Sequence, residues 1–259
     1  MKELLIIGDD VHTIRYISSI LYNDKIELTI FDYNKKTKEI ADHYLIKKIN
    51  HNDLKDKIND YDYIIYTLPN SFNKNIFEIL KDYKNNLLLE KPQLNIELIK
   101  KLNCRVSFIH LRNYDNNNYK QPKQNNNIIW PNLINDGMDP IINTTPNIID
   151  FVILLYKDKK IDKLEVINIK HNNGIDFTLK VNTQIFNIHI INTNDKELLP
   201  KYNEETINWP NYFLCITDFI NELLYNNVNF ENSIKEEEKI NKIIKQIRGD
   251  KNGFKENEL

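Results

Sequence analysis

The residues from Gly8 to Thr13 lie where a predicted strand meets a predicted helix, which is the place of a loop that binds the pyrophosphate of a dinucleotide. Such a loop has the pattern Gly-x-Gly-x-x-Gly, and of these three glycines only Gly8 is present. Asp10 and Thr13 stand at the second and third glycine positions. An aspartate at the second position brings bulk and negative charge toward a dianion at a helix N-terminus. The spacing therefore predicts a dinucleotide site whose loop is altered at two positions.

Two further side chains could contact such a ligand. Asp32 ends the next predicted strand, about 24 residues after Gly8, where a carboxylate can accept hydrogen bonds from a ribose diol and would repel a 2′-phosphate. This favours NAD(H) over NADP(H), although Asp32 could equally cap the helix that follows it. His12 lies in the loop itself and could donate a hydrogen bond to a phosphate group.

The first 112 residues alternate between short apolar runs and helical patterns, which predicts βαβ units and a mainly parallel, doubly wound sheet. Ligands of such sheets bind beyond the carboxyl ends of the strands. Ser71 is a candidate N-cap for one of the helices. The predicted strands are Leu4–Gly8, Ile26–Phe31, Tyr44–Lys48, Tyr63–Thr67, Asn86–Leu89 and Arg105–His110, and the predicted helices are Val11–Tyr22, Lys35–His43, Asn52–Ile58, Asn73–Tyr83 and Asn95–Leu102.

Residues 113–259 have a different pattern, which predicts a second domain of the α+β class with a mainly antiparallel sheet. Tyr114–Asn127 is polar and is expected to be an exposed loop or a domain boundary. The strands of the second domain should form a meander with one apolar and one polar face. The predicted strands are Lys163–His171, Asp176–Asn182 and Gln184–Ile191, and the predicted helices are Asn147–Tyr156, Tyr212–Leu224 and Ile234–Ile247.

Composition limits the classes of function. The chain has 259 residues, of which 41% are hydrophobic and 28% charged, so we expect a globular protein. Its net charge of -2 argues against a nucleic-acid partner, and no apolar run is long enough for a membrane helix. The two cysteines are expected to be buried free thiols in a reducing cytoplasm, and no metal is expected because no pair of His or Cys has metal-ligand spacing. The 41 asparagines and five glycines indicate an AT-rich coding sequence.

Several segments, taken in order over nearly the full chain, resemble the glucose–fructose oxidoreductase, inositol dehydrogenase and MocA family. The most specific is Glu90-Lys91-Pro92, which follows the apolar run Leu87–Leu89. The other matching segments are Tyr66–Asn70, Phe108–Arg112, Trp130 with Gly137, Asn147–Asp150, the meander, Phe219–Leu224, and Ser233 with the last helix.

The resemblance implies an N-terminal Rossmann-type domain and an NAD(P)-dependent oxidoreductase that acts on a sugar, sugar nucleotide or cyclitol. It implies that Lys91 contacts both substrate and cofactor. At that position an ammonium group can polarise a carbonyl group of the substrate or lower the pKa of its hydroxyl group. It also implies a cis peptide bond before Pro92. The implied cofactor contacts are Gly8, Asp10, Val11, His12, Asp32, Thr67, Leu68, Pro69, Asn73, Glu90 and Lys91, and the implied substrate contacts are Lys91, His110, Arg112, Asn143 and Asn147.

Three positions depart from the family pattern. The Asp and His that the family carries on one helical face fall on Asn143 and Asn147, and a further family His falls on Asn73. Asparagine can bind a substrate hydroxyl group but cannot carry a proton. His110 and Arg112, at the end of the last strand of the first domain, could substitute, or His110 could be a half-buried strand residue. The alternative function is a catalytically inactive binding or regulatory subunit, with or without a cofactor.

The resemblance also concerns partners. Many members of the family pair through the open face of the second sheet, so a homodimer is expected, although Thr178, Lys180, Asn182 and Asn187 make this face polar. The chain is short for the family, with only polar loop expected between Arg112 and Gly137. The substrate cleft is therefore expected to be open or completed by a partner chain.

Overall fold

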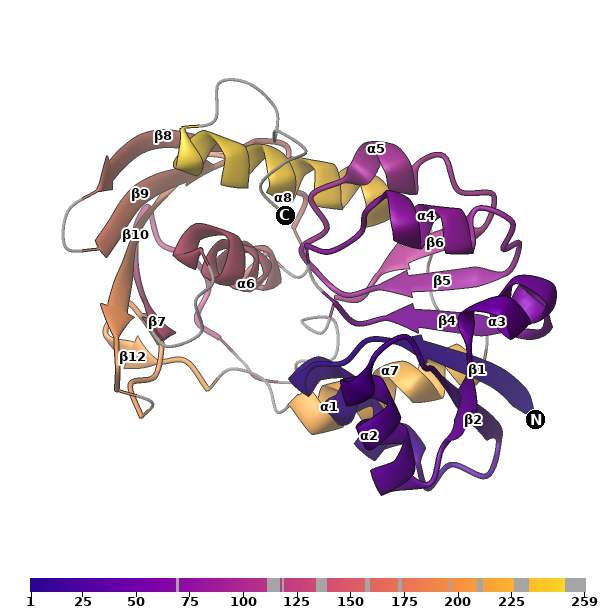
Figure 1. The fold of residues 1–259 in the computed structure, drawn as a ribbon. Helices are drawn as coiled ribbons and strands as arrows, with labels where there is room; N and C mark the ends of the chain where they lie inside the picture. Colours follow the sequence, from indigo (N-terminus) through magenta and orange to yellow (C-terminus); the bar gives the residue numbers. More distant parts are fainter. Residues whose placement is uncertain are drawn as a thin grey trace. The chain divides into compact units, whose positions relative to one another are not determined.

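The computed structural model describes residues 1–68, 70–110, 117, 119–133, 139–156, 159–171, 174–195, 197–208, 212–225 and 233–249, and Figure 1 shows their fold. The chain forms two compact units. The first unit comprises Met1–Tyr114 and Asn211–Glu238, and the second comprises Asp115–Pro210 and Lys239–Leu259. The chain therefore leaves the first unit after Tyr114 and returns to it at Asn211.

The first unit is built around a six-stranded parallel sheet with the strand order β3-β2-β1-β4-β5-β6. The strand order reverses between β1 and β4, and ligands of doubly wound sheets bind beyond the carboxyl ends of the strands at such a reversal. The predicted Rossmann-type topology is therefore confirmed. The strands are β1 (Lys2–Ile7), β2 (Ile26–Phe31), β3 (Lys47–Ile49), β4 (Tyr63–Tyr66), β5 (Asn86–Leu89) and β6 (Arg105–Phe108).

Helices cover both faces of this sheet because its strands are apolar on both sides (Figure 1). Leu4 and Ile6 of β1 belong to one core, with residues of α1, α2 and α7, whereas Leu5 and Ile7 belong to the other, with residues of α3, α4 and α5. The helices are α1 (Val11–Ile20), α2 (Lys35–Tyr44), α3 (His51–Lys57) with a following 3-10 turn (Ile58–Asp60), α4 (Lys74–Leu80), α5 (Ile96–Ile99) and α7 (Tyr212–Leu224).

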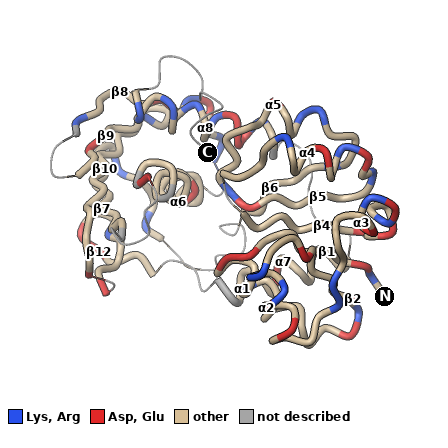
Figure 2. The backbone as a smooth tube through the Cα atoms, viewed as in Figure 1, with Lys and Arg blue, Asp and Glu red and all other residues tan. Residues whose placement is uncertain are grey.

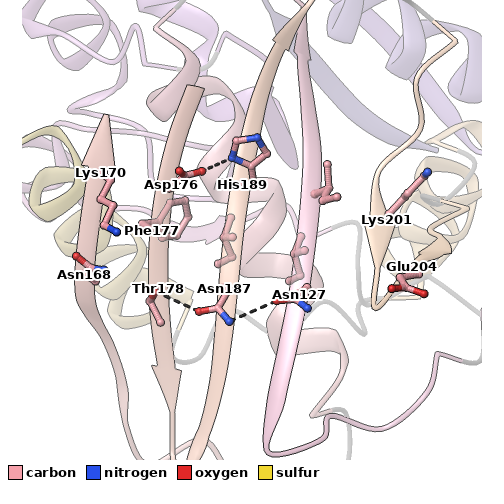
Figure 3. Close-up of a pocket in the computed structure, with 13 residues that line it drawn as sticks. Asn127, Asn168, Lys170, Asp176, Phe177, Thr178, Asn187, His189, Lys201 and Glu204 are labelled. Carbon is pink, nitrogen blue, oxygen red and sulfur yellow. Dashed lines mark hydrogen bonds and ion pairs between the residues drawn. The ribbon is translucent and has the colours of Figure 1, made fainter. Parts of the chain in front are cut away.

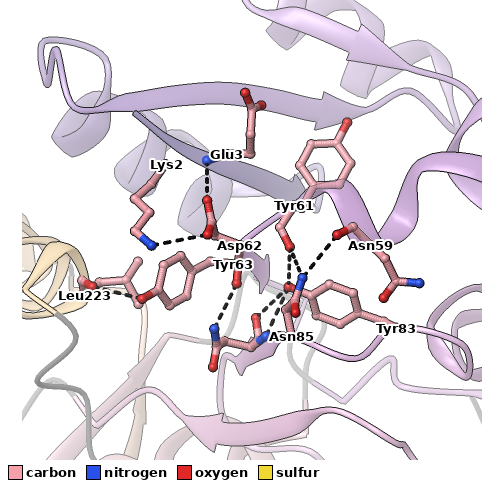
Figure 4. Close-up of polar contacts among 10 residues, drawn as sticks. Lys2, Glu3, Asn59, Tyr61, Asp62, Tyr63, Tyr83, Asn85 and Leu223 are labelled. Carbon is pink, nitrogen blue, oxygen red and sulfur yellow. Dashed lines mark hydrogen bonds and ion pairs between the residues drawn. The ribbon is translucent and has the colours of Figure 1, made fainter.

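Polar contacts close the amino ends of these strands (Figure 4). Lys2 Nζ and the backbone N–H of Glu3 donate to the carboxylate of Asp62, at 3.2 and 2.9 Å. The hydroxyl group of Tyr63 donates to the carbonyl oxygen of Leu223 at 3.1 Å and so fixes the end of α7. The amino ends of the strands are therefore held by hydrogen bonds within the first unit. The candidate site residues lie at the carboxyl ends of the strands.

The second unit contains a mixed sheet in the order β12-β11-β7-β10-β9-β8. Strands β8, β9 and β10 form the predicted antiparallel meander, whereas β7 pairs with β10 in parallel. Helix α6 (Pro140–Leu154) and residues from Ile240 to Ile247 of α8 (Ser233–Arg248) pack in the core of this unit. The strands are β7 (Asn125–Leu133), β8 (Leu164–His171), β9 (Gly174–Val181), β10 (Gln184–Thr193), β11 (Lys201–Tyr202) and β12 (Glu205–Thr206).

Strand β7 corrects the expectation that only polar loop lies between Arg112 and Gly137. The strand starts inside the polar run, and Asn126 is fully buried. Its side-chain amide donates to the carbonyl oxygens of Lys123 and Ile185, at 2.8 and 3.2 Å, and its oxygen accepts from the hydroxyl group of Tyr202 at 2.9 Å. In the sequence, an asparagine that becomes buried with its hydrogen bonds satisfied cannot be told from a loop asparagine. The polar pattern therefore did not predict this strand.

Basic and acidic residues are interspersed along the backbone of both units (Figure 2). In the part of the chain that the structure describes, no helix is long and apolar enough to cross a membrane. Within the same residues no group of three His, Cys, Asp or Glu side chains is arranged to hold a metal ion.

Candidate active site

Gly8 lies where β1 meets α1, at a point where a side chain would not fit. A Cβ atom at this position would lie 1.8 Å from Oγ1 of Thr67 and 2.4 Å from Oγ1 of Thr13. Both threonines are fully buried, and their hydroxyl oxygens are 2.6 Å apart. Gly8 therefore allows the first turn of α1 to approach the end of β4, which is one role of glycine in dinucleotide-binding loops.

Asp10 and Thr13, the residues at the other two glycine positions, bond to each other. Asp10 is the N-cap of α1, and its Oδ1 accepts from the backbone N–H of Thr13 at 2.9 Å and from the hydroxyl group of Thr13 at 3.1 Å. The backbone N–H of Asp10 donates to Thr13 Oγ1 at 3.3 Å. This capping box satisfies N–H groups that a helix start leaves without partners. The two departures from the glycine pattern are therefore one structural unit.

His12 connects this loop to the Glu90-Lys91-Pro92 turn. Its Nδ1 lies 3.4 Å from Oε1 of Glu90, a buried carboxylate that also accepts from the hydroxyl group of Tyr16 at 3.4 Å. Burial of the imidazole acts to lower the pKa of His12, but the hydrogen bond and the charge of Glu90 oppose burial and leave this pKa raised. The raised pKa favours the imidazolium form of His12, whose positive charge lies beside the N-terminus of α1.

Asp32 follows β2, and it does not cap the next helix. The N-cap of α2 is Asn34, whose side chain accepts from the backbone N–H of Thr37 at 2.9 Å, so the capping alternative for Asp32 is wrong. Asn34 also donates to the carboxylate of Asp9 at 2.7 Å. Among the described residues the half-buried carboxylate of Asp32 has no hydrogen bond or ion pair. It can accept hydrogen bonds from a ligand at the end of β2.

The turn after β5 is held by one buried amide. The peptide bond between Lys91 and Pro92 is cis, as the resemblance implies. The next residue, Gln93, is fully buried, and its Nε2 donates to the carbonyl oxygens of Leu68 and Glu90, each at 2.8 Å. The backbone N–H of Gln93 donates to Oε1 of Glu237, near the start of α8, at 3.1 Å. The turn is thus tied both to the loop after β4 and to α8.

Lys91 and His110 meet at the carboxyl ends of β5 and β6. Lys91 Nζ and His110 Nδ1 lie 3.0 Å apart. The imidazole of His110 is buried, and its Nε2 lies 3.9 Å from Oε2 of Glu236 in α8. A carboxylate from the distant C-terminal part of the chain therefore adjoins the pair of Lys91 and His110.

The remaining predicted site residues have simpler surroundings. Val11, the first residue of α1, is exposed, and the carbonyl oxygen of Leu68 accepts from Ser71 Oγ at 3.1 Å as well as from Gln93. Asn73 is the N-cap of α4, and its side chain accepts from the backbone N–H groups of residues 75 and 76, so the expectation of a cap at Ser71 is wrong.

Asn143 and Asn147 lie one turn apart on α6 of the second unit. Pro69, Arg112 and the side chain of Asn143 lie outside the described residues.

Two residues of this site are absent from the sequence-based expectations. Glu236 and Glu237 lie more than 120 positions after the residues that they contact. The only signal for them is the run Glu236-Glu237-Glu238 near the start of a predicted helix. Acidic residues are common there because they interact favourably with the helix dipole, so the run does not reveal these contacts.

The second unit carries a separate, open cavity of about 610 Å³ on the exposed face of its sheet (Figure 3). Asn187 donates to Asn127 at 3.3 Å and accepts from Thr178 at 3.4 Å, which forms a polar row across three strands. His189 pairs with Asp176 in the next row. None of the predicted site residues lines this cavity. It is the face through which the resemblance implies pairing of two copies, and its polar character is as expected.

Comparison with known proteins shows the fold. No family model and no curated protein sequence matches the chain. Among solved structures, the dehydrogenase MviM from Clostridium difficile has 16% sequence identity and a TM-score of 0.72, with 96% of this chain and 99% of that chain covered. A myo-inositol dehydrogenase from Lactobacillus casei, in complex with NAD(H) and myo-inositol, has 12% identity and a TM-score of 0.73, with 97% and 96% covered. UDP-N-acetylglucosamine 3-dehydrogenase GnnA from Acidithiobacillus ferrooxidans has 12% identity and a TM-score of 0.70, with 96% and 97% covered.

Proposed function

We propose that this protein is an NAD(H)-dependent oxidoreductase that acts on a sugar, a sugar nucleotide or a related polyol, with Lys91 as its main polar catalytic group. The observation that carries the proposal is the position of Lys91. Its ammonium group lies on a fixed turn at the carboxyl end of β5, hydrogen-bonded to His110 at 3.0 Å. Ligands of doubly wound sheets bind at this edge. The NAD(H) and myo-inositol complex of one structural neighbour supports the same assignment.

The residues of the first unit offer partners to a nicotinamide dinucleotide. The carboxylate of Asp32 suits a ribose diol, and it would repel the 2′-phosphate of NADP(H). The first N–H groups of α1, at Val11 and His12, and the imidazole of His12 suit a phosphate group. Asp10 opposes this binding because its carboxylate occupies the cap of the same helix. We therefore expect NAD(H) to bind, but less tightly than with an uncharged residue at position 10.

Lys91 would act on the oxygen of the substrate. When bound, the nicotinamide ring supplies the acceptor or donor of the hydride at its C4 atom. The ammonium group of Lys91 can donate a hydrogen bond to a carbonyl oxygen, or stabilise the alkoxide that forms when a hydroxyl group loses its proton. Asn143 and Asn147 can bind substrate hydroxyl groups but cannot exchange protons with them.

The second candidate function is a catalytically inactive binding or regulatory subunit. The capping box of Asp10 and Thr13 favours it, because this loop satisfies its own polar groups without a ligand. Under this alternative the fold is retained and hydride transfer is lost.

Titration with NADH and NADPH separates the two candidates. We expect NADH to bind, measured by nucleotide fluorescence and by thermal shift, and to bind more tightly than NADPH. No binding of either nucleotide at millimolar concentration would overturn the oxidoreductase proposal. With a sugar or cyclitol substrate, Lys91→Ala should abolish turnover and leave the melting temperature close to that of the wild type. Lys101→Ala, a change at an exposed lysine, is the matched control.

A further inference from the structure

His110 is placed between a cation and an anion that come from different parts of the chain. Its Nδ1 faces Lys91, which follows β5, at 3.0 Å, and its Nε2 faces Glu236, in α8, at 3.9 Å. A lysine ammonium group has donors only, so Nδ1 is the acceptor of this hydrogen bond and the neutral imidazole carries its proton on Nε2. The proton-bearing nitrogen is thus the one that faces the carboxylate.

The start of α8 is fixed by contacts on both sides of Glu236. Glu237 is fully buried and accepts from the backbone N–H of Gln93 at 3.1 Å. Glu238 pairs with Lys100, which follows α5. These contacts hold α8 against the turn that carries Lys91, so the distance between Glu236 and His110 is set by the fold rather than by a flexible surface pair.

We infer that Lys91, His110 and Glu236 form a proton relay, in which His110 stores the proton and Glu236 is a positioning residue for its imidazole. The inference deepens the proposed function and rests on it. In the oxidation direction the substrate hydroxyl group gives its proton to Lys91, while Lys91 gives one of its own protons to Nδ1 of His110. The charge of Lys91 is unchanged, His110 becomes an imidazolium, and the hydride leaves separately to the nicotinamide.

Charge supports this direction of transfer. An imidazole has a pKa near neutrality and can hold the proton that Asn143 and Asn147 cannot. Lys91 disfavours the imidazolium, whereas Glu236 favours it. The side chain of Glu236 is 31% exposed, so it connects the buried histidine with solvent, where the stored proton can be released.

The relay can be tested without turnover by NMR titration of protein labelled at histidine. The chain has six histidines, and His110→Gln assigns the signal of His110. We expect Glu236→Gln to lower the pKa of His110 by roughly one pH unit, because it removes a carboxylate within about 4 Å. Lys91→Met should shift this pKa in the opposite direction. Glu39→Gln, at an exposed glutamate of α2, is the control and should leave it unchanged. An unchanged pKa of His110 in Glu236→Gln would overturn the positioning role.

Turnover separates the relay from the proposed function. His110→Gln keeps a hydrogen-bond acceptor for Lys91 but cannot carry the proton, so kcat should fall roughly 100-fold, with NADH affinity close to that of the wild type. Glu236→Gln should displace the pH profile of kcat with little change in KM, and Glu236→Asp should restore part of the difference. Full turnover of a folded His110→Gln variant overturns the relay and leaves the oxidoreductase proposal standing. Absence of NADH binding in the wild type overturns the proposed function instead.

Discussion

The hydroxyl oxygens of Thr13 and Thr67 lie 2.6 Å apart, and Gly8 lies directly against both. This contact joins the start of α1 to the end of β4, across the point where the strand order of the sheet reverses. In the glycine pattern the third glycine allows the helix to pack closely on the strand. Here a threonine at that position forms the close contact through its hydroxyl group, and Asp10 completes it by capping the helix through Thr13.

The contact predicts that Gly8→Ala is destabilising. Its Cβ would meet Thr67 Oγ1 at 1.8 Å in a fully packed region, so the free energy of unfolding should fall by about 1–3 kcal/mol. Adding Thr67→Ala to Gly8→Ala removes the nearest atom and should recover part of the loss. Chemical denaturation of the single and double variants measures both effects, and a Gly8→Ala protein as stable as the wild type would show that the loop opens without cost.

Asp10 is expected to oppose dinucleotide binding while it stabilises α1. Asp10→Gly should tighten NADH binding, because it removes a charge beside the pyrophosphate position. Asp10→Asn separates the two effects, since asparagine caps a helix about as well as aspartate but carries no charge. It should keep the melting temperature and also tighten NADH binding. Fluorescence titration at constant ionic strength measures the affinities, and weaker binding in both variants would show that Asp10 is adapted to its ligand.

The sequence predicted the elements whose apolar pattern is strong and missed those whose polar residues are buried. The parallel sheet was predicted because β1, β4 and β5 are continuous apolar runs, which few other structures accommodate. Strand β7 was missed because Asn126 resembles a loop residue until its hydrogen-bond partners in the fold are known. The site residues divide in the same way. The Glu90-Lys91-Pro92 motif identified Lys91 from the sequence, whereas Glu236 is recognised only in the structure, where α8 places it near His110.

His12 should make stability depend on pH near neutrality. Its pKa in the folded protein is raised above the ordinary value of 6.5, so protonation favours folding. The contribution of His12 is fully present below pH 6.5 and is lost as the pH rises through the pKa of the folded state. Thermal unfolding from pH 5.5 to 9 should show His12→Gln less stable than the wild type at acidic pH, with the difference shrinking at alkaline pH. A difference that does not vary with pH would contradict the ion pair between His12 and Glu90.

Asp32 should determine the choice between NADH and NADPH. Asp32→Ser removes the carboxylate that suits a ribose diol and that would repel a 2′-phosphate. NADH should bind more weakly and NADPH more tightly relative to NADH, by competitive fluorescence titration. Because Asp32 has no hydrogen bond or ion pair among the described residues, the melting temperature without ligand should hardly change. An unchanged ratio of the two affinities would place the adenosine ribose elsewhere.

Gln93 should be required to hold the turn that carries Lys91. Gln93→Met keeps the approximate volume of this fully buried side chain but leaves the carbonyl oxygens of Leu68 and Glu90 without its amide donor. Loss of partners for buried polar groups costs about 1–3 kcal/mol each, so the free energy of unfolding should fall measurably. Lys91 should also lose its fixed position, so kcat should fall even at temperatures where the variant is folded. Gln124→Met, at an exposed glutamine of the second unit, is the control. If Gln93→Met lowers stability but leaves kcat at the wild-type value, the turn positions Lys91 without the amide.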